Sequence, residues 1–223
     1  MTSARAILIW TALAAATAVP IGAAAASPLL AWRAPIYIAA GFAGIVGLAL
    51  LLVQPLLIGG YLPGPSAVRA RRVHPWIGGL LVASVVLHVG ALWITSPQDV
   101  IDVLLFQSPT PFSVWGVIGM WAVFAAALLA ALRRRLRLHP RTWRMGHAFL
   151  AVVIVVGSVV HALLIEGTME TISKAVLCGL VLAAIAKVIA DLLIWPCRAH
   201  PSQGQGNRQL PGPMAADVYE ESK

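Results

Sequence analysis

The sequence contains few charged residues, and acidic residues are the scarcest. Asp, Glu, Lys and Arg make up only 11% of the 223 residues, and Asp and Glu together number just 8. Water-soluble domains carry about 25% charged residues, so this composition excludes a soluble protein. Hydrophobic residues make up 60% of the chain. The sequence therefore predicts a protein whose surface faces lipid.

Cysteines are also scarce, and no soluble binding module is recognisable. Cys178 and Cys197 do not have the spacing of a metal site or a redox pair. The net charge of +8 comes from arginines that flank apolar segments, without any recognisable nucleic-acid-binding motif. Nucleic acid is therefore not expected as a partner, and the lipid bilayer is.

Six long apolar stretches are typical of membrane-spanning helices. Most are close to the roughly 20 residues that cross a bilayer, and a spanning segment must satisfy its own backbone hydrogen bonds, which favours helices. With short loops they use nearly the whole chain and leave no room for a soluble catalytic domain. We expect an all-α polytopic membrane protein, a bundle of six transmembrane helices at residues 6–26, 36–61, 75–94, 112–132, 147–165 and 173–195.

The first stretch has two interpretations. Arg5, an apolar run and the small residues before Ser27 are also compatible with a cleavable signal peptide. The run is about 20 residues long, which exceeds the usual core of a signal peptide. We therefore favour a retained first helix.

The basic residues lie on one side of the predicted spans. The positive-inside rule places that side, and with it both the N- and the C-terminus, in the cytoplasm. The opposite side holds only two basic residues and is acidic. The expected cytoplasmic side has Arg5, Arg69, Arg71, Arg72, Arg133, Arg134, Arg135, Arg137, Arg141, Arg144, Arg198, Arg208 and Lys223; the other side has Arg33, Lys174, Asp99, Asp102, Glu166 and Glu170.

Four histidines form two pairs with the same spacing. His74 and His88 lie 14 residues apart in the third span, and His147 and His161 lie 14 apart at the fifth. In an α-helix this interval is almost four turns, with a residual of about 40° and a rise of about 21 Å. Each helix thus carries two imidazoles on nearly one face, toward opposite edges of a hydrocarbon core about 30 Å thick.

The predicted topology places the histidines of the two pairs at matching depths in the membrane, because the third and fifth spans run in the same direction. His74 then pairs with His147 near the inner edge, and His88 with His161 toward the outer leaflet. Two imidazoles are a common axial ligand set for b-type haem within a helix bundle. Two ligands are too few for tetrahedral zinc, and no Cys-x-x-Cys-His motif for covalent haem is present. A proton relay in a transporter remains the alternative.

The residues beside the histidines suggest further roles. His74 precedes Pro75, which we expect in the first turn of the third span. Arg144, three residues before His147, is the best candidate to contact a haem propionate or a flavin, although most arginines serve as a topology signal. Glycines near the histidines either admit a flat macrocycle or let helices pack closely; they are Gly78, Gly90, Gly146 and Gly157.

Other polar residues have simpler interpretations. Lys187 and Asp191 are one turn apart in the sixth span, where they are expected to neutralise one another. The remaining histidines, His139 and His200, precede prolines in cytoplasmic segments and are expected to be solvated.

Two runs resemble the ferric reductase-like transmembrane domain: RRVHPWIGGLLVASVVLHVGALW at 71–93 and WRMGHAFLAVVIVVGSVVHALL at 143–164. That superfamily includes ferric reductases, NADPH oxidases and the haem-binding subunit of periplasmic methionine sulfoxide reductase. The resemblance covers about residues 36–195. It implies six helices, two b haems and outward electron transfer across the membrane. Carried over by position, the haem iron ligands are His74, His88, His147 and His161.

The resemblance also implies partners. The electron donor is expected to be a cytoplasmic flavoprotein, reduced flavin or membrane quinol, and the acceptor ferric iron or a partner protein at the outer face. FMN or FAD as a further cofactor stays open. So does the choice between a reductase and a haem-binding anchor subunit of a partner oxidoreductase. The expected location is a bacterial-type inner membrane.

The expected domain organisation has three parts. Residues 1–35 form the first helix and an outer loop, 36–195 form the haem-binding domain, and 196–223 form a disordered cytoplasmic tail. Ferric reductases and NADPH oxidases usually append flavin and nicotinamide domains, and a short polar tail stands in their place here. Direct oxidation of NADPH by this chain alone is therefore not expected.

Overall fold

The structure is a computed structural model that describes residues 3–198. Within them every regular element is helical, which confirms the predicted all-α class. Six helices are long and apolar enough to cross a membrane. The predicted tail at 196–223 falls almost wholly outside the described residues. The long helices are α1 (Ser3–Ala25), α2 (Pro35–Ile58), α3 (Ala67–Thr95), α5 (Pro111–Leu132), α6 (Pro140–Leu164) and α7 (Thr171–Arg198).

Two short helical elements were not predicted. A 3-10 turn, η1 (Pro28–Leu30), follows α1, and an amphipathic helix, α4 (Pro97–Leu104), joins α3 to α5. Both begin at a proline, a residue suited to the first helical position because its missing N–H has no partner to lose there. At 3 and 8 residues, both are far shorter than the roughly 20 residues of a span, so a search for apolar spans does not find them.

The two histidine-bearing helices start earlier than predicted. Ser66 caps α3 by accepting a hydrogen bond from the amide of Arg69, so α3 already runs through the arginines before His74. Pro75 therefore lies inside α3, and its predicted place in the first turn is wrong. Likewise α6 begins at Pro140, in its first helical position. Hydropathy marks the lipid boundary, whereas these helices extend beyond it into polar sequence.

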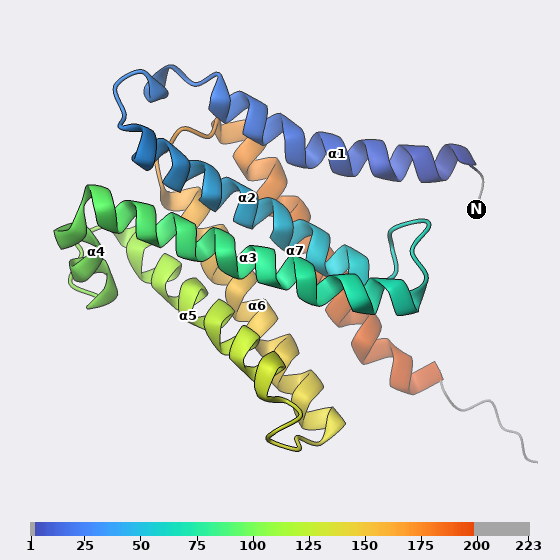
Figure 1. The fold of residues 1–223 in the computed structure, drawn as a ribbon. Helices are drawn as coiled ribbons and strands as arrows, with labels where there is room; N and C mark the ends of the chain where they lie inside the picture. The colour runs from blue at the N-terminus through green and yellow to red at the C-terminus, as the bar shows by residue number, and fades with distance from the viewer. Residues whose placement is uncertain (1–2, 199–223) are drawn as a thin grey trace, which may run out of the picture.

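The helices form two antiparallel hairpins, α2–α3 and α5–α6, and both pack against α7 (Figure 1). Helix α2 packs along α3, and α5 packs along α6. Helix α7 contacts both α2 and α6, and α1 lies against α2 and α7. The largest fully buried side chains, Leu177, Cys178 and Val181, belong to α7. The core thus lies where the two hairpins meet α7, and many large apolar side chains remain on the surface, as expected of a protein in lipid.

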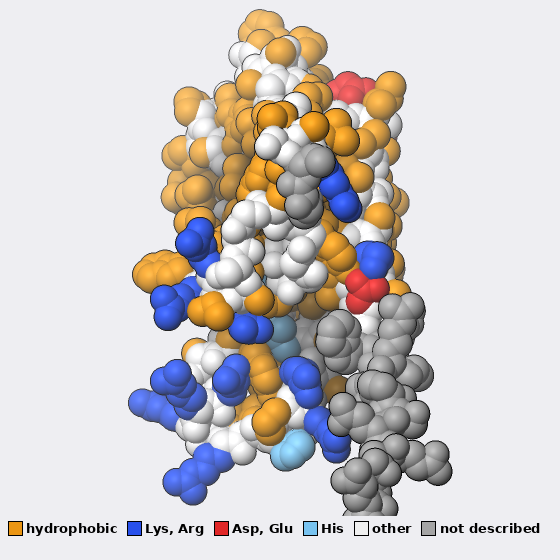
Figure 2. Space-filling model, turned by 90° about the vertical axis from the view of Figure 1, so that its right-hand side faces the viewer, with side chains coloured by type: hydrophobic (Ala, Val, Ile, Leu, Met, Phe, Trp, Pro, Cys, Tyr) orange, Lys and Arg blue, Asp and Glu red, His pale blue; other side chains and the backbone are white. Residues whose placement is uncertain are grey.

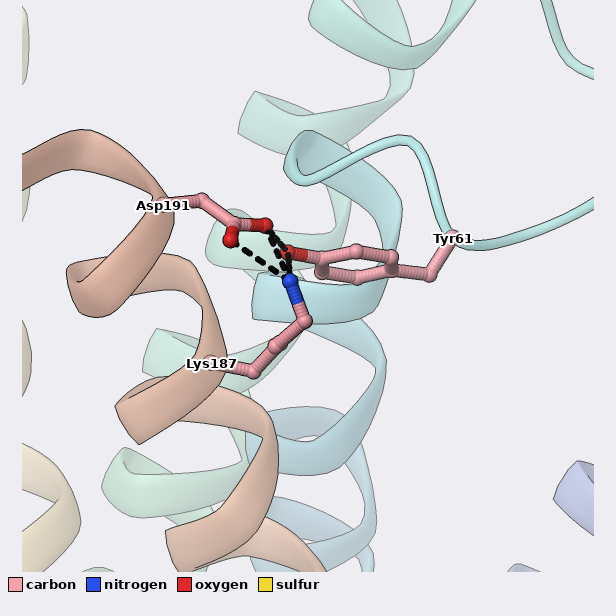
Figure 3. A network of polar contacts seen from close by, with 3 residues as sticks. All are labelled: Tyr61, Lys187 and Asp191. Atoms are coloured by element: carbon pink, nitrogen blue, oxygen red, sulfur yellow. Dashed lines mark hydrogen bonds and ion pairs between the residues drawn. The ribbon is translucent and has the colours of Figure 1, made fainter. Parts of the chain in front are cut away.

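Each hairpin is tied to α7 by a polar contact. At one end the Lys187 ammonium lies 2.6 Å from the Asp191 carboxylate, which confirms the predicted ion pair. Tyr61, in the α2–α3 connection, donates its hydroxyl to the same carboxylate (Figure 3). Burial and that hydrogen bond raise the pKa of Tyr61 above its usual value. At the other end Lys174 is only 7% exposed and donates to the carbonyl of Ile165 at 2.9 Å.

The connections rich in arginine gather at one end of the bundle. The α2–α3 and α5–α6 connections lie there, and the indole of Trp10 in α1 donates to the carbonyl of Pro63 at 3.2 Å, which brings the start of α1 to the same end. Figure 2 shows blue Lys and Arg side chains over the lower part of this face, below a largely apolar region. We call this the arginine end.

Candidate metal centres between α3 and α6

The structure brings the four spaced histidines together as two facing pairs. The ring centroids of His74 and His147 are 6.2 Å apart, and those of His88 and His161 are 6.3 Å apart. Helices α3 and α6 must therefore run parallel, as the sequence predicts. We call His74 with His147 the arginine-side pair, because the arginine end lies beside it, and His88 with His161 the far-side pair.

The ring separations are suited to a shared metal ion. Metal–imidazole bonds in proteins are about 2.0–2.1 Å long, so two rings on opposite sides of one ion have centroids about 6 Å apart. Among the described residues no group of three or more His, Cys, Asp or Glu side chains converges on one point. That pattern does not fit tetrahedral zinc. It fits an iron whose other ligands come from a macrocycle, as in a haem with two axial histidines.

The far-side histidines are held by backbone carbonyls of the partner helix in each hairpin. His88 Nδ1 donates to the carbonyl of Ala40 in α2 at 2.7 Å, and His161 Nδ1 donates to the carbonyl of Phe112 in α5 at 2.9 Å. A carbonyl only accepts, so each Nδ1 carries the proton. Each Nε2 is then left with the lone pair that a metal ion needs.

A glycine makes each of these contacts possible. Gly44 lies one turn after Ala40, and Gly116 lies one turn after Phe112, on the faces that meet the rings. A methyl group at Gly44 would lie 3.2 Å from Nδ1 of the facing histidine, and one at Gly116 would lie 2.7 Å away. A methyl group at Gly116 would therefore force the ring to shift, whereas one at Gly44 would require a displacement of only a few tenths of an ångström.

The arginine-side histidines lack such anchors. His74 Nδ1 and His147 Nδ1 are both buried without a hydrogen-bond partner. Instead, Trp143 stacks on the His147 ring, with centroids 4.9 Å apart. Gln54 of α2 lies beside His74 and donates to its backbone carbonyl at 3.4 Å, while its own side-chain oxygen is buried and unpaired. This layer therefore holds polar atoms with unused bonding capacity.

A basic hollow opens beside the arginine-side pair. It has a volume of about 520 Å³, and its polar lining comes mainly from the α5–α6 connection. Arg144, predicted as a cofactor contact, lines this hollow, and its Nε donates to the carbonyl of Pro140 at 3.3 Å. The guanidinium of Arg133 covers the Trp143 ring at 5.4 Å. The full lining is Arg133, Arg134, Arg137, Leu138, Pro140, Trp143 and Arg144.

The glycines singled out from the sequence have different surroundings. A methyl group at Gly157 would meet the backbone of α5, at 2.9 Å from the carbonyl of Trp115, so this glycine serves helix packing. Gly90 has no neighbour within 4 Å. The glycines that do touch histidine rings, Gly44 and Gly116, were missed. A shared sequence motif could have pointed to them: both α2 and α5 contain Gly-x-x-Gly. The motif begins at Gly44, 44 residues before His88, and at Gly116, 45 residues before His161.

Two acidic residues at the far end, Asp102 and Glu170, make local hydrogen bonds. Glu170 accepts hydrogen bonds from the amides of Ile172 and Ser173 and so caps α7. Those bonds, the one from Ser173 first, lower the pKa of Glu170 below its usual value. Asp102 accepts from the side chain of Gln98 at 3.2 Å. His139, predicted to be solvated, is exposed just before α6.

Comparison with known proteins identifies a family. The family described as "Ferric reductase like transmembrane component" matches residues 40–158, more than half of the chain. The match includes three of the four paired histidines and ends three residues before His161. Neither a curated protein nor a solved structure matches the chain. The chain belongs to the family of ferric reductase-like transmembrane components.

Proposed function

We propose that this protein carries electrons across a membrane through two b haems, one held by His74 and His147 and the other by His88 and His161. The observation that carries the proposal is the equal ring separation of 6.2 and 6.3 Å in two pairs on parallel helices. Family membership supports electron transfer across a membrane as the general role. Bound haem would supply a one-electron iron couple at each layer.

The chain itself supplies ligation, spacing and orientation. The four imidazoles present two layers whose separation is set by a 14-residue interval, about 21 Å along a helix. The carbonyls of Ala40 and Phe112 orient the far-side rings. We propose residues 36–195 as the haem-binding domain.

The arginine end is the proposed cytoplasmic side, and the proposed location is a bacterial-type inner membrane. The concentration of basic residues at the α2–α3 and α5–α6 connections supports this orientation. With this orientation, both termini are proposed to lie inside. Reporter fusions after residues 34 and 64 provide the test: an external signal after 34 and an internal one after 64 are expected, and the reverse would invert the proposed direction of electron flow.

The hollow beside Trp143 is the proposed entry point for electrons. Its arginines suit an anionic donor, such as a flavin phosphate or an acidic flavoprotein surface. Trp143 stacks on His147 and so joins this hollow to the arginine-side pair. A membrane quinol is the alternative donor. Ferric iron or a partner protein at the far end is the proposed acceptor.

A reduced-minus-oxidised absorption spectrum with haem quantification tests the central proposal. The purified full-length protein is expected to show a b-type spectrum with about two haems per chain. Replacing both far-side histidines with alanine should remove one haem, and replacing both arginine-side histidines should remove the other. His139→Ala is the matched control and should keep both. A spectrum without a b-type signal, or one untouched by the four ligand replacements, would contradict the proposal.

The acceptor is tested by reoxidation. The reduced protein is mixed with a ferric chelate, and the rate of haem reoxidation is followed. Rapid reoxidation that depends on the far-side histidines supports ferric iron as the acceptor. Stable reduced haem would argue instead for a dedicated partner protein, the role of an anchor subunit.

A further inference from the structure

The two histidine layers differ in what lies behind each ring. In the far-side pair both Nδ1 atoms donate to backbone carbonyls, at 2.7 Å for His88 and 2.9 Å for His161. In the arginine-side pair both Nδ1 atoms are buried and have no hydrogen-bond partner. The four Nδ1 atoms therefore differ by layer: those of the far-side pair are hydrogen-bonded, and those of the arginine-side pair are not.

A hydrogen bond from Nδ1 to a carbonyl makes an imidazole a stronger ligand. The bond fixes the tautomer and the ring orientation, and it raises the basicity of the ligating nitrogen. A more basic axial ligand stabilises ferric over ferrous iron, because it donates more electron density to the more highly charged metal. The far-side layer thus favours the oxidised state.

The charges nearby act in the same direction. The hollow beside the arginine-side pair is lined by four arginines, and the guanidinium of Arg133 lies over the tryptophan that stacks on His147. Positive charge favours the form of the site that has gained an electron. The arginine-side layer therefore favours the reduced state.

We propose that the carbonyls of Ala40 and Phe112 are positioning groups of the far-side haem site, and that Gly44 and Gly116 exist to admit the rings to them. The proposal rests on the proposed haem-binding function. Its consequence is an asymmetric pair: the far-side haem binds more tightly and has a lower reduction potential than the arginine-side haem.

The geometry of the two glycines makes the idea testable. A methyl group at Gly116 would lie 2.7 Å from His161 Nδ1 and 3.0 Å from Cε1 of the same ring, so the ring must move off its carbonyl. At Gly44 the corresponding distances to His88 are 3.2 and 3.3 Å, so the displacement is smaller. Gly41 is a matched control in α2, because its nearest neighbour would be 3.9 Å away.

The experiment is a spectroelectrochemical titration of the purified full-length protein with haem bound. Wild type is expected to show two midpoints, and the variant without the arginine-side histidines should retain only the lower one. Gly116→Ala should raise that lower midpoint toward the upper one and weaken haem binding at the far-side site by roughly 10- to 100-fold. Gly44→Ala should act in the same direction with a smaller shift, and Gly41→Ala should change neither midpoint.

The outcomes separate this proposal from the one on which it rests. A wild-type protein without haem overturns the proposed function, and this inference with it. Two bound haems with equal midpoints, or with the far-side midpoint higher, overturn this inference alone. So does a Gly116→Ala or Gly44→Ala protein that keeps both haems and both wild-type midpoints. Assigning the two midpoints to the layers needs only a variant that lacks one histidine pair, so the order of the midpoints can be tested even if a glycine variant fails to fold.

Discussion

Both helix hairpins have a glycine beside a histidine ring, but the space at that glycine differs between them. In the α5–α6 hairpin a methyl group at Gly116 would meet the facing histidine ring at 2.7 Å, against 3.2 Å at Gly44 in the α2–α3 hairpin. Three residues further along, the backbones of Gly119 and Gly157 approach so closely that an added methyl at Gly157 would lie 3.1 Å from Gly119. Gly47 in α2 is the equivalent of Gly119, and a methyl group there would have its nearest contact at 3.8 Å, against 3.4 Å at Gly119.

The difference shows that a glycine beside a histidine ring and a glycine at a helix–helix backbone contact serve separate purposes, even three residues apart in one helix. Both hairpins need a glycine where the ring reaches the carbonyl. Only the α5–α6 hairpin also needs glycines for its own backbone contact. We therefore expect the α2–α3 hairpin to tolerate substitution better than the α5–α6 hairpin.

The largest expected effect is that of Gly157→Ala. Its methyl group would meet backbone atoms at 2.9 and 3.1 Å, and backbone cannot move aside as a flexible side chain can. We expect a loss of about 3 kcal/mol in the free energy of unfolding, the upper end for overpacking. Gly47→Ala is the matched control and should be neutral. Unfolding in detergent measures both, and equal effects would remove the distinction between the hairpins.

The ties to α7 should rank next. Lys174→Met leaves the carbonyl of Ile165 without its charged donor in a buried place, with an expected loss of about 2 kcal/mol. Tyr61→Phe, at the arginine end, removes a hydrogen bond to Asp191 in a more accessible position, so its expected loss is about 1 kcal/mol. The same unfolding measurement applies. A larger loss for Tyr61→Phe would show that the arginine end carries the main anchor of α7.

A smaller effect is expected for Trp143→Ala. The substitution removes the ring stacked on His147 at 4.9 Å, a contact of about 1 kcal/mol. Haem at the arginine-side layer should bind about fivefold more weakly, and the far-side layer should be unaffected. Haem titration of the apoprotein measures this. Trp76→Ala is the control, since that side chain in α3 is 79% exposed; an equal loss there would mean that Trp143 acts only through general packing.

The smallest effect concerns the cap of α7. The pKa of Glu170 is lowered by the amides it accepts from, so its contribution to stability is complete above the unfolded value of about 4.3. The contribution is lost as the pH falls through the lowered folded value. Glu170→Gln should flatten this acid limb of the stability curve, while Glu166→Gln, in the same connection, should leave it in place. If Glu170→Gln loses stability at acid pH as wild type does, the loss is due to other carboxyl groups.

Much of the fold could be predicted because the bilayer imposes it. Apolar stretches of the right length had to be helices, and all six were located. Their ends were less accurate: α3 begins at Ala67, well before the apolar run, because Ser66 caps it and arginines continue a helix readily. Helix α4 escaped detection because its amphipathic pattern is not that of a span.

The site could be predicted only where a helical interval governs it. The 14-residue spacing, with the predicted parallel direction of the two spans, identifies His88 and His161 as neighbours in depth, and the structure brings their ring centroids to 6.3 Å apart. Their role as haem ligands stays a prediction. Spacing within one helix carries no information about the helix packed beside it. The contacts of Gly44 and Gly116, and the stacking of Trp143 on His147, depend on how two helices rotate against each other, which no single interval specifies.

The two layers on parallel helices also determine how the protein would respond to voltage. Fourteen residues span about 21 Å, roughly two thirds of a hydrocarbon core about 30 Å thick. An electron that moves between the layers therefore crosses about two thirds of the membrane potential, equivalent to about 1.5 kcal/mol for every 100 mV. With the arginine end inside an energised cell, the field drives electrons outward, so the histidine interval makes the proposed reaction electrogenic.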